Sequence, residues 1–351
     1  MSLKEASGPP GPPWNGELKG RFERLTVDSE VLAANPLGDP PRRPLYVYSP
    51  PGAHDALPSV YLIQGMTGQL DMWLNRNAFE PTILERIDEM FAGGTAPALV
   101  VFVDAWTSYG GSQFINSAST GRYMDYLCDE VVPFIDERYE TIADRDHRAI
   151  TGKSSGGYGA MVVPMLRPDV FGAFASHAGD ALFEACYLKD FPETARVLRD
   201  HHDGSYETFF KAMRAAPALD YSKYGVALNT YAMAACYSPD EADPGKARLP
   251  FDIETGRLID DVWAEWLAWD PVRIAPKRAD ALRSMKLIYL DAGRSDEYYL
   301  DLGAQAFAKE LDALDVPYTL ELFDGRHGGI SYRYPGAIKA LVEAVSREAP
   351  S

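Results

Sequence analysis

Ser154 lies at the centre of the strongest chemical motif in the sequence. The motif reads Gly152-Lys153-Ser154-Ser155-Gly156. It has the form Gly-x-Ser-x-Gly and joins a predicted strand at 149–150 to a predicted helix at 156–166. A tight turn in this position exposes the serine at a helix N-terminus, where free N–H groups stabilise developing negative charge. This context predicts that Ser154 is a nucleophile, with Ser155 as the neighbouring candidate.

A serine nucleophile needs a base and an acid that orients the base. His327 is the predicted base, because it lies in a glycine-flanked loop between the last predicted strand and the last predicted helix. Sequences with this serine motif place the acid between the serine and the histidine. Asp296 fits, since it lies in the turn after the predicted strand 287–290. Asp180, which follows the preceding strand, remains a rival for this role.

Cleavage of an ester also needs two N–H donors that stabilise the oxyanion of the tetrahedral intermediate. The N–H of Ser155, directly after the nucleophile, is the first predicted donor. The second is predicted at Met66, in the turn 64–68 that follows the third predicted strand. Gly65 permits a tight bend there, so Gly65 and Thr67 are also predicted to lie at the substrate.

Four further features have competing interpretations. Trp106 follows the fourth predicted strand and would form a wall of the acyl or alcohol site, although a core position is an equal alternative. His177 is placed at the rim of the site near Asp180, where it would touch substrate. Lys153 is more simply explained by a salt bridge beneath the turn than by an electrostatic role in the site. The three-residue spacing of three tryptophans puts them on one helix face, which favours a lid core over a substrate platform. They are Trp263, Trp266 and Trp269.

The elements that must position these residues alternate between strand and helix. Short apolar runs predict strands at 24–32, 44–48, 59–63, 98–103, 149–150, 171–175, 287–290 and 318–323. Amphipathic stretches predict helices at 82–91, 121–139, 156–166, 299–314 and 337–345. Runs that are apolar on both faces suit parallel strands covered by helices, so the predicted fold class is α/β with a mostly parallel sheet. Residues 180–281 break the alternation and predict a mainly helical insertion, packed as a lid.

Length, composition and charge exclude several classes of protein. The chain has 351 residues, of which 46% are hydrophobic and 24% charged, as in ordinary globular domains. A net charge of −17 disfavours nucleic acid and anionic membranes as partners. Residues 1–20 predict a disordered Pro/Gly-rich tail with no signal peptide, and a cytoplasmic protein is expected. Because the serine precedes the insertion while the acid and base follow it, residues 21–351 are predicted to form one catalytic domain.

No cofactor or metal is expected. Three cysteines without a CxxC pair are interpreted as buried small hydrophobic residues in a reducing compartment. They are Cys128, Cys186 and Cys236. The sequence His201-His202-Asp203 offers metal-ligand types, but it lies in a polar stretch with no further ligand placed, so a solvated loop is preferred.

Together these features resemble the α/β-hydrolase superfamily. More narrowly, the chain is similar to the esterase family that includes esterase D, enterochelin esterase, feruloyl esterases and mycolyltransferases. The segments that carry the resemblance are 60–65, 144–148, 152–160, 293–296 and 325–327, and it extends over about 24–180 and 282–347. The resemblance implies an α/β-hydrolase fold with about eight strands. It also implies that Ser154 is the nucleophile, Asp296 the acid, His327 the base and Met66 an oxyanion donor.

Two residues depart from the family pattern. Gln64 occupies a position where many members carry histidine, and Lys153 one where histidine, phenylalanine or leucine is common. No segment matches the loops that would indicate an S-formylglutathione or siderophore substrate.

The resulting expectation is a cofactor-free serine carboxylesterase acting on small-molecule esters or thioesters through an acyl-enzyme. Two alternatives stay open: an acyltransferase that passes the acyl group to an alcohol, and a non-catalytic binding protein on a hydrolase scaffold. The net charge makes a strongly anionic ester a less favoured substrate. A homodimer is not excluded by the sequence.

Overall fold

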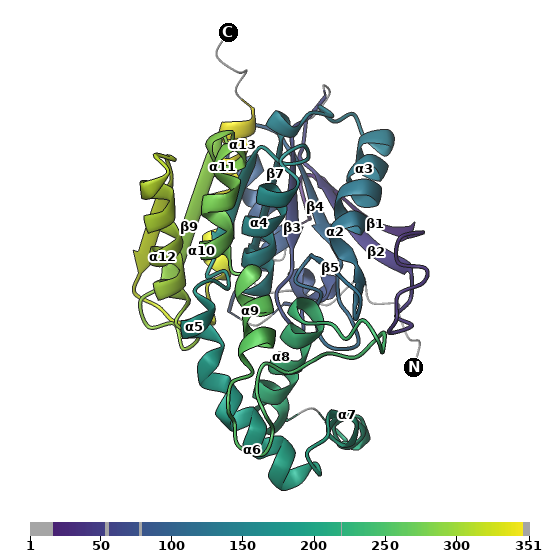
Figure 1. Ribbon diagram of the computed structural model, residues 1–351. Coiled ribbons are helices and arrows are strands. Elements are labelled where there is room, and N and C mark those ends of the chain that lie inside the picture. The colour runs from purple at the N-terminus through teal and green to yellow at the C-terminus, as the bar shows by residue number, and fades with distance from the viewer. Residues whose placement is uncertain (1–16, 53–55, 77–78, 219, 347–351) are drawn as a thin grey trace, which may run out of the picture.

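The computed structural model describes residues 17–52, 56–76, 79–218 and 220–346, and its centre is an eight-stranded sheet (Figure 1). The strand order is β1-β2-β4-β3-β7-β8-β9-β10. The strands are β1 (Arg21–Asp28), β2 (Arg42–Ser49), β3 (Ser59–Ile63), β4 (Leu99–Val103), β7 (Arg148–Lys153), β8 (Ala173–His177), β9 (Leu287–Gly293) and β10 (Thr319–Phe323). β2 is antiparallel to both of its neighbours, and all pairings from β4 to β10 are parallel. The predicted α/β class with a mostly parallel sheet is confirmed.

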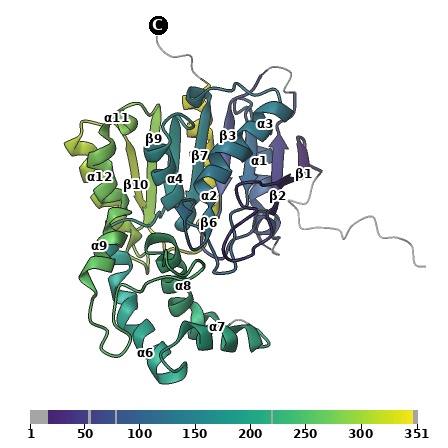
Figure 2. The ribbon, with the colours of Figure 1, turned by 45° about the vertical axis from the view of Figure 1, so that its right-hand side comes forward.

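Helices cover both faces of the sheet, because the central strands are apolar on both sides. In β3, Val60 and Leu62 belong to one core, and Tyr61 and Ile63 belong to the other. Helices α1 (Ile83–Ala92) and α13 (Tyr334–Val345) pack into the first core. The second core is covered by α2 (Tyr123–Asp125), α3 (Val132–Arg138), α4 (Ser155–Leu166), α11 (Ala279–Arg283) and α12 (Leu300–Ala313). In Figure 2, α2 and α3 lie in front of the sheet.

Short elements complete this part of the fold. They are the two-stranded sheet of β5 (Asn116–Ser117) and β6 (Gly121–Arg122), the 3₁₀ helices η1 (Leu70–Leu74), η3 (Arg145–His147) and η6 (Ser331–Arg333), and the π-helical turn η2 (Tyr126–Val131). The π-helical turn lies between α2 and α3, so the helix predicted at 121–139 is present but irregular.

Helices fill the segment between β8 and β9, and its described residues form no strand of either sheet. They are α5 (Phe183–Cys186), η4 (Leu188–Asp190), α6 (Phe191–His201), α7 (Tyr206–Ala215), α8 (Tyr221–Tyr237), α9 (Asp260–Ala268), α10 (Pro271–Ile274), η5 (Ala275–Arg278) and α11. Figure 1 shows α6, α7 and α8 beyond the carboxyl ends of the parallel strands. They share an aromatic core that includes Phe209, Tyr224 and Tyr231. By contrast, α10 and α11 pack against α4 and belong to the helical layer on the sheet.

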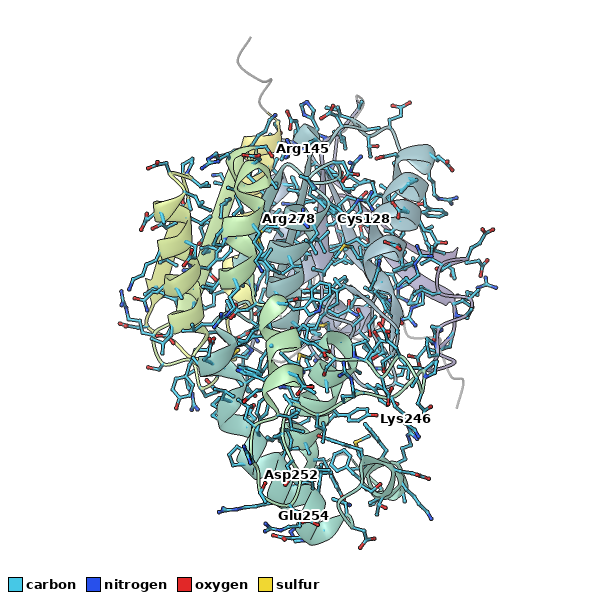
Figure 3. All side chains as sticks on the ribbon, viewed as in Figure 1. Cys128, Arg145, Lys246, Asp252, Glu254 and Arg278 are labelled. Carbon is cyan, nitrogen blue, oxygen red and sulfur yellow. The ribbon has the colours of Figure 1, made fainter. Side chains whose placement is uncertain are left out.

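Two ends of the molecule are distinct in Figure 3, where Arg145 lies at the end of the sheet opposite the insertion and Asp252 and Glu254 lie at the tip of the insertion. Arg145 bonds to the carbonyl oxygens of Pro168 (2.5 Å) and Ser284 (3.3 Å), and so anchors the segment that enters β7. The Gly-x-Ser-x-Gly motif follows at the other end of β7. β7 thus runs from the end of the sheet that Arg145 anchors to the end that carries the insertion.

Three remaining sequence expectations concern the tail, the cysteines and the membrane. Residues 1–16 of the predicted tail lie outside the described residues, while the N–H groups of Lys19 and Gly20 donate to the Asp88 carboxylate. The three cysteines are buried and free. No helix in the described part of the chain is long and apolar enough to cross a membrane.

Candidate active site

Ser154 occupies a strained turn between β7 and α4. Its backbone angles are φ 59° and ψ −126°, a conformation that costs a non-glycine residue free energy and is concentrated at functional sites. Two hydrogen bonds hold the turn: the Ser154 N–H donates to the His177 carbonyl (3.0 Å), and its own carbonyl accepts from the Tyr158 N–H (2.8 Å). The surrounding backbone therefore imposes a geometry that presents the Ser154 side chain at the carboxyl end of the sheet.

Glycines on both sides let the turn and the loop after β3 approach each other. A Cβ at Gly156 would lie 2.5 Å from the carbonyl oxygen of Ile63, and a Cβ at Gly65 would lie 2.8 Å from that of Lys153. Any larger residue would push the two segments apart. Gly65 lines the pocket beside Ser154, and its lack of a side chain lets the backbone after β3 approach the serine turn closely.

The two N–H groups predicted as oxyanion donors face the same pocket. Met66 and Ser155 both line it, and neither N–H donates a hydrogen bond to another described residue. Ser155 is the first residue of α4, where the helix itself offers its N–H no partner. Thr67 is placed differently: it is exposed, its N–H donates to the Gly110 carbonyl (2.7 Å), and it lies outside the pocket lining. Thr67 therefore supports the loop instead of contacting a pocket ligand.

Gln64 fixes the base of this loop. Its buried amide donates to the Gly68 carbonyl (3.2 Å) and to the Asp104 carboxylate (3.4 Å), which also pairs with Arg43. Its role is thus structural.

His327 and Asp296 are joined by a hydrogen bond of 2.9 Å between Nδ1 and Oδ2. Asp296 is buried, and its other oxygen accepts the Tyr298 N–H at 2.9 Å. Two neighbours of Asp296 also hold the histidine: Glu297 accepts the His327 N–H (3.0 Å), and the Tyr298 ring lies edge-on to the imidazole at 4.8 Å. The hydrogen bond from the His327 backbone also lowers the pKa of Glu297. Three consecutive residues thus orient His327.

Ser154 and His327 line one pocket of about 510 Å³. No hydrogen bond joins their side chains in the described structure, and such contacts often tighten only when a ligand binds. The structure therefore brings Ser154, His327 and Asp296 to one place from three separate loops. Their catalytic roles are addressed below as a proposal.

Asp180 lies in the same pocket but does not bond to His327. Its Oδ2 accepts from the Tyr187 hydroxyl (2.8 Å), the Gln113 amide (3.2 Å) and the Ser155 hydroxyl (3.4 Å). Burial raises the pKa of Asp180, against the opposing effect of the Tyr187 and Gln113 hydrogen bonds. The contacts favour Asp296 over Asp180 as the partner of the histidine.

The predictions for His177 and Trp106 are wrong. His177 is fully buried behind the serine turn, where its Nδ1 lies 2.9 Å from Oδ1 of Asp291, so it cannot touch a pocket ligand. Trp106 lies outside the pocket lining, and its side chain is 38% exposed. Tyr109, in the same loop as Trp106, contacts the insertion, where its ring stacks on Phe210 with 5.1 Å between the ring centroids.

Asp291 explains the position of His177. The strand β9 continues to Gly293, three residues beyond the predicted end of the apolar run, and this places Asp291 within the sheet. Asp291 also accepts from Arg333 Nε (2.8 Å). Burial opposes ionisation of Asp291, but the hydrogen bonds from His177 and Arg333 outweigh it and lower its pKa. A buried polar network therefore supports the sheet below the nucleophile.

Lys153 lines the pocket, and the preferred salt bridge beneath the turn is absent: its ammonium group makes no ion pair with any described residue. Burial lowers the pKa of Lys153, and the charges of Asp296, Glu297 and Asp180 oppose that shift.

Much of the pocket wall comes from residues that no motif marks. Helix α8 contributes Tyr221, Gly225, Val226 and Asn229, and the lining also includes Tyr298, Leu300 and Ile330. The three tryptophans of the insertion are not in the lining. Trp266 is fully buried, and Trp263 packs beside it at 6.0 Å. The only sequence signal for the α8 residues is their position within the predicted insertion, and the only signal for Tyr298, Leu300 and Ile330 is their closeness in sequence to Asp296 and His327.

The described residues contain no group of three or more His, Cys, Asp or Glu side chains able to hold a metal. His202 is buried against Phe209 at 5.2 Å, so the solvated-loop interpretation is wrong for this residue, whereas His201 and Asp203 are exposed.

The strained serine turn, the paired histidine and aspartate, and the sheet order define the class of α/β-hydrolases. The chain belongs to the family described as "Putative esterase", whose model matches residues 40–328.

Solved structures of low sequence identity share the fold, and curated relatives match shorter segments of the chain. A ferulic acid esterase structure is 19% identical, with a TM-score of 0.57 over 93% of this chain and 98% of that chain. The S-formylglutathione hydrolase from Agrobacterium tumefaciens is 16% identical, with a TM-score of 0.56 over 95% and 98%. An uncharacterized protein of Corynebacterium glutamicum is 28% identical over 39% of this chain, and an endo-1,4-beta-xylanase/feruloyl esterase of Xylanibacter ruminicola is 29% identical over 26%. These matches span only 32% and 13% of the two relatives.

Proposed function

We propose that this protein is a serine carboxylesterase that cleaves small-molecule esters or thioesters through an acyl-enzyme on Ser154. The observation that carries the proposal is the 2.9 Å bond between His327 and Asp296 in the pocket that also contains the strained Ser154. Membership of the esterase family supports it.

The mechanism follows from the positions of the groups. His327 takes the proton of Ser154 as the hydroxyl attacks the carbonyl carbon, while Asp296 holds the imidazole in the required tautomer. The N–H groups of Met66 and Ser155 stabilise the oxyanion. His327 then protonates the leaving group, and a water molecule activated by the same imidazole cleaves the acyl-enzyme.

The substitution Ser154→Ala tests this proposal. It should abolish hydrolysis of 4-nitrophenyl acetate and butyrate, and labelling by a fluorophosphonate probe, while the thermal unfolding midpoint changes little. Unchanged turnover in the variant would contradict the proposal. Failure of the wild type to react with the probe would instead favour the non-catalytic binding protein.

The substrate panel should include feruloyl esters and S-formylglutathione, because the similar structures include enzymes named for them. Tyr221 and Tyr298 in the pocket wall offer faces for an aromatic acyl group.

Acyl transfer is the second candidate, and the position of α8 favours it. This helix forms part of the pocket wall beside Ser154, and wall residues that exclude water from an acyl-enzyme favour transfer to an alcohol over hydrolysis. Adding glycerol or trehalose and measuring acylated alcohol against free acid separates the two reactions.

A further inference from the structure

Lys153 is a cation without a contact partner beside the nucleophile. It is the last residue of β7, precedes Ser154 and lines the pocket. Among the described residues its ammonium group forms no hydrogen bond and no ion pair, although it is mostly buried. Lys189, the other lysine of the pocket, differs: its Nζ lies 2.9 Å from Asp190 and 5.2 Å from the Tyr298 ring centroid.

The carboxylates nearest to Lys153 are occupied by other donors. Both oxygens of Asp296 are used, one by His327 and one by the Tyr298 N–H. Glu297 accepts the His327 N–H and lies 3.5 Å from Arg326. These contacts leave the donors of Lys153 unused.

Asp180 is occupied in the same way, since Tyr187, Gln113 and Ser155 all donate to its Oδ2. Burial also favours its neutral form. Asp180 therefore compensates the charge of Lys153 only in part.

An unpaired ammonium in a pocket of largely apolar side chains is costly unless a ligand supplies an anion. Apolar residues of this pocket include Met66, Ile83, Val226, Leu300 and Ile330. A carboxylate would restore charge-assisted hydrogen bonds to the Lys153 ammonium. The net charge of −17 does not oppose this, because charges further away than about 8 Å are largely screened at physiological salt.

We propose that the substrate is an ester that carries a carboxylate group, and that Lys153 binds this carboxylate beside Ser154. The proposal rests on the proposed esterase function and specifies the substrate class of the same site. The carboxylate belongs either to the acyl group or to the alcohol.

Two matched pairs of esters test the proposal. In the first pair, 4-nitrophenyl glutarate carries the carboxylate on its acyl group, and 4-nitrophenyl 4-carbamoylbutanoate is its neutral amide. In the second pair, 3-acetoxybenzoate carries the carboxylate on its alcohol part, and 3-acetoxybenzamide is its neutral amide. The ratio of kcat/KM for the charged ester over its neutral amide is measured for each pair, after subtraction of the rate with Ser154→Ala.

The charged ester should be preferred in one pair. Lys153→Met should lower that ratio about 10- to 100-fold, mainly through KM, as expected for loss of a hydrogen bond to a charged group. Lys153→Arg should retain most of the ratio, and the matched control Lys189→Met should change it less than about threefold, because Lys189 is already paired. An unchanged ratio in both pairs for Lys153→Met, or an equal fall for Lys189→Met, would overturn the proposal.

Binding to the inactive protein separates this proposal from the esterase function. Calorimetric titration of the charged esters into Ser154→Ala, with and without Lys153→Met, needs no turnover. Tighter binding that depends on Lys153 supports the carboxylate site even if the wild type hydrolyses neither pair, in which case only the esterase function fails. Equal affinity with and without the lysine refutes the carboxylate site whatever the activity.

Discussion

The substitution Asp296→Asn should almost abolish turnover without removing the site. The reason lies in the two hydrogen bonds of Asp296: Oδ1 accepts the Tyr298 N–H and Oδ2 bonds to Nδ1 of His327. In the variant the amide oxygen must accept the Tyr298 N–H, so the NH₂ group faces the histidine. Nδ1 then becomes an acceptor and Nε2 carries the proton, which prevents it from accepting the Ser154 proton.

The expected magnitude follows from this change of tautomer. In serine triads such a substitution lowers kcat about 10³- to 10⁴-fold, which corresponds to about 4–5 kcal/mol of activation free energy. Steady-state hydrolysis of 4-nitrophenyl butyrate at pH 7.5 to 8 measures it, with KM reported separately because the pocket wall is unchanged. Circular dichroism and the thermal midpoint establish that the variant is folded.

Glu297→Gln is the matched control. Glu297 lies next to Asp296 and accepts the His327 backbone N–H, which a glutamine carbonyl can also accept. Its kcat should stay within about tenfold of the wild type, the size of one modest hydrogen-bond change. If Asp296→Asn also stayed within that range, the assignment of the acid would be refuted, and Asp180 would have to be tested in its place.

Three further predictions concern stability and reactivity. Gly156→Ala should destabilise the protein by about 1–3 kcal/mol or more, measured by urea unfolding, because its Cβ would lie 2.5 Å from the Ile63 carbonyl oxygen; a neutral effect would contradict the close approach. Asp291→Asn should destabilise the protein at pH 7 by less than the about 3–5 kcal/mol of an orphaned buried charge, because Arg333 loses its buried partner but keeps its ion pair with the half-exposed Glu321. The pKa of Asp291 is lower in the folded than in the unfolded protein. The stabilisation by its carboxylate is therefore complete above the unfolded pKa of about 3.9 and is lost as the pH falls through the folded pKa. The variant lacks this carboxylate, so acid should lower its free energy of unfolding less than that of the wild type. Cys128, whose pKa burial raises to about 12, should not react with a disulfide reagent at pH 8 until the protein unfolds.

The residues proposed for catalysis were predictable because strand ends carry them. Ser154 follows β7, Met66 follows β3, and Asp296 and His327 follow β9 and β10. Apolar runs mark these strands in the sequence, and the carboxyl ends of parallel strands lie on one edge of the sheet. The fold class was predictable from the same apolar runs, because runs that are apolar on both faces indicate parallel strands covered by helices.

His177 and Thr67 were misplaced because side-chain direction depends on details that an apolar run does not specify. His177 is still within β8, and its partner Asp291 is within the longer β9, so the two meet inside the structure. Thr67 has a positive φ of 60°, which turns its N–H toward Gly110. Neither feature has a sequence signature.

The pocket wall was unpredictable for a different reason. Helix α8 presents Tyr221, Gly225, Val226 and Asn229 to the site, a set with no shared chemistry. The aromatic residues of the insertion are divided between two cores: Phe209 and Tyr231 belong to its own core, whereas Tyr237, Trp263 and Trp266 belong to the core shared with the sheet. The break in the alternation of strands and helices therefore identified the insertion, whereas no sequence pattern identified those of its residues that line the pocket.

Net charge and local charge answer different questions in this protein. The charge of −17 spreads over the whole chain and governs encounters with large charged surfaces, such as nucleic acid or a membrane. A small ester inside the pocket meets only the groups within about one screening length. There, Asp296, Glu297 and Asp180 already accept hydrogen bonds from other donors, whereas the Lys153 ammonium has no acceptor among the described residues. The expectation that an acidic protein avoids an anionic substrate therefore does not extend to this site, and one lysine beside the nucleophile has more influence on substrate choice than the seventeen excess carboxylates.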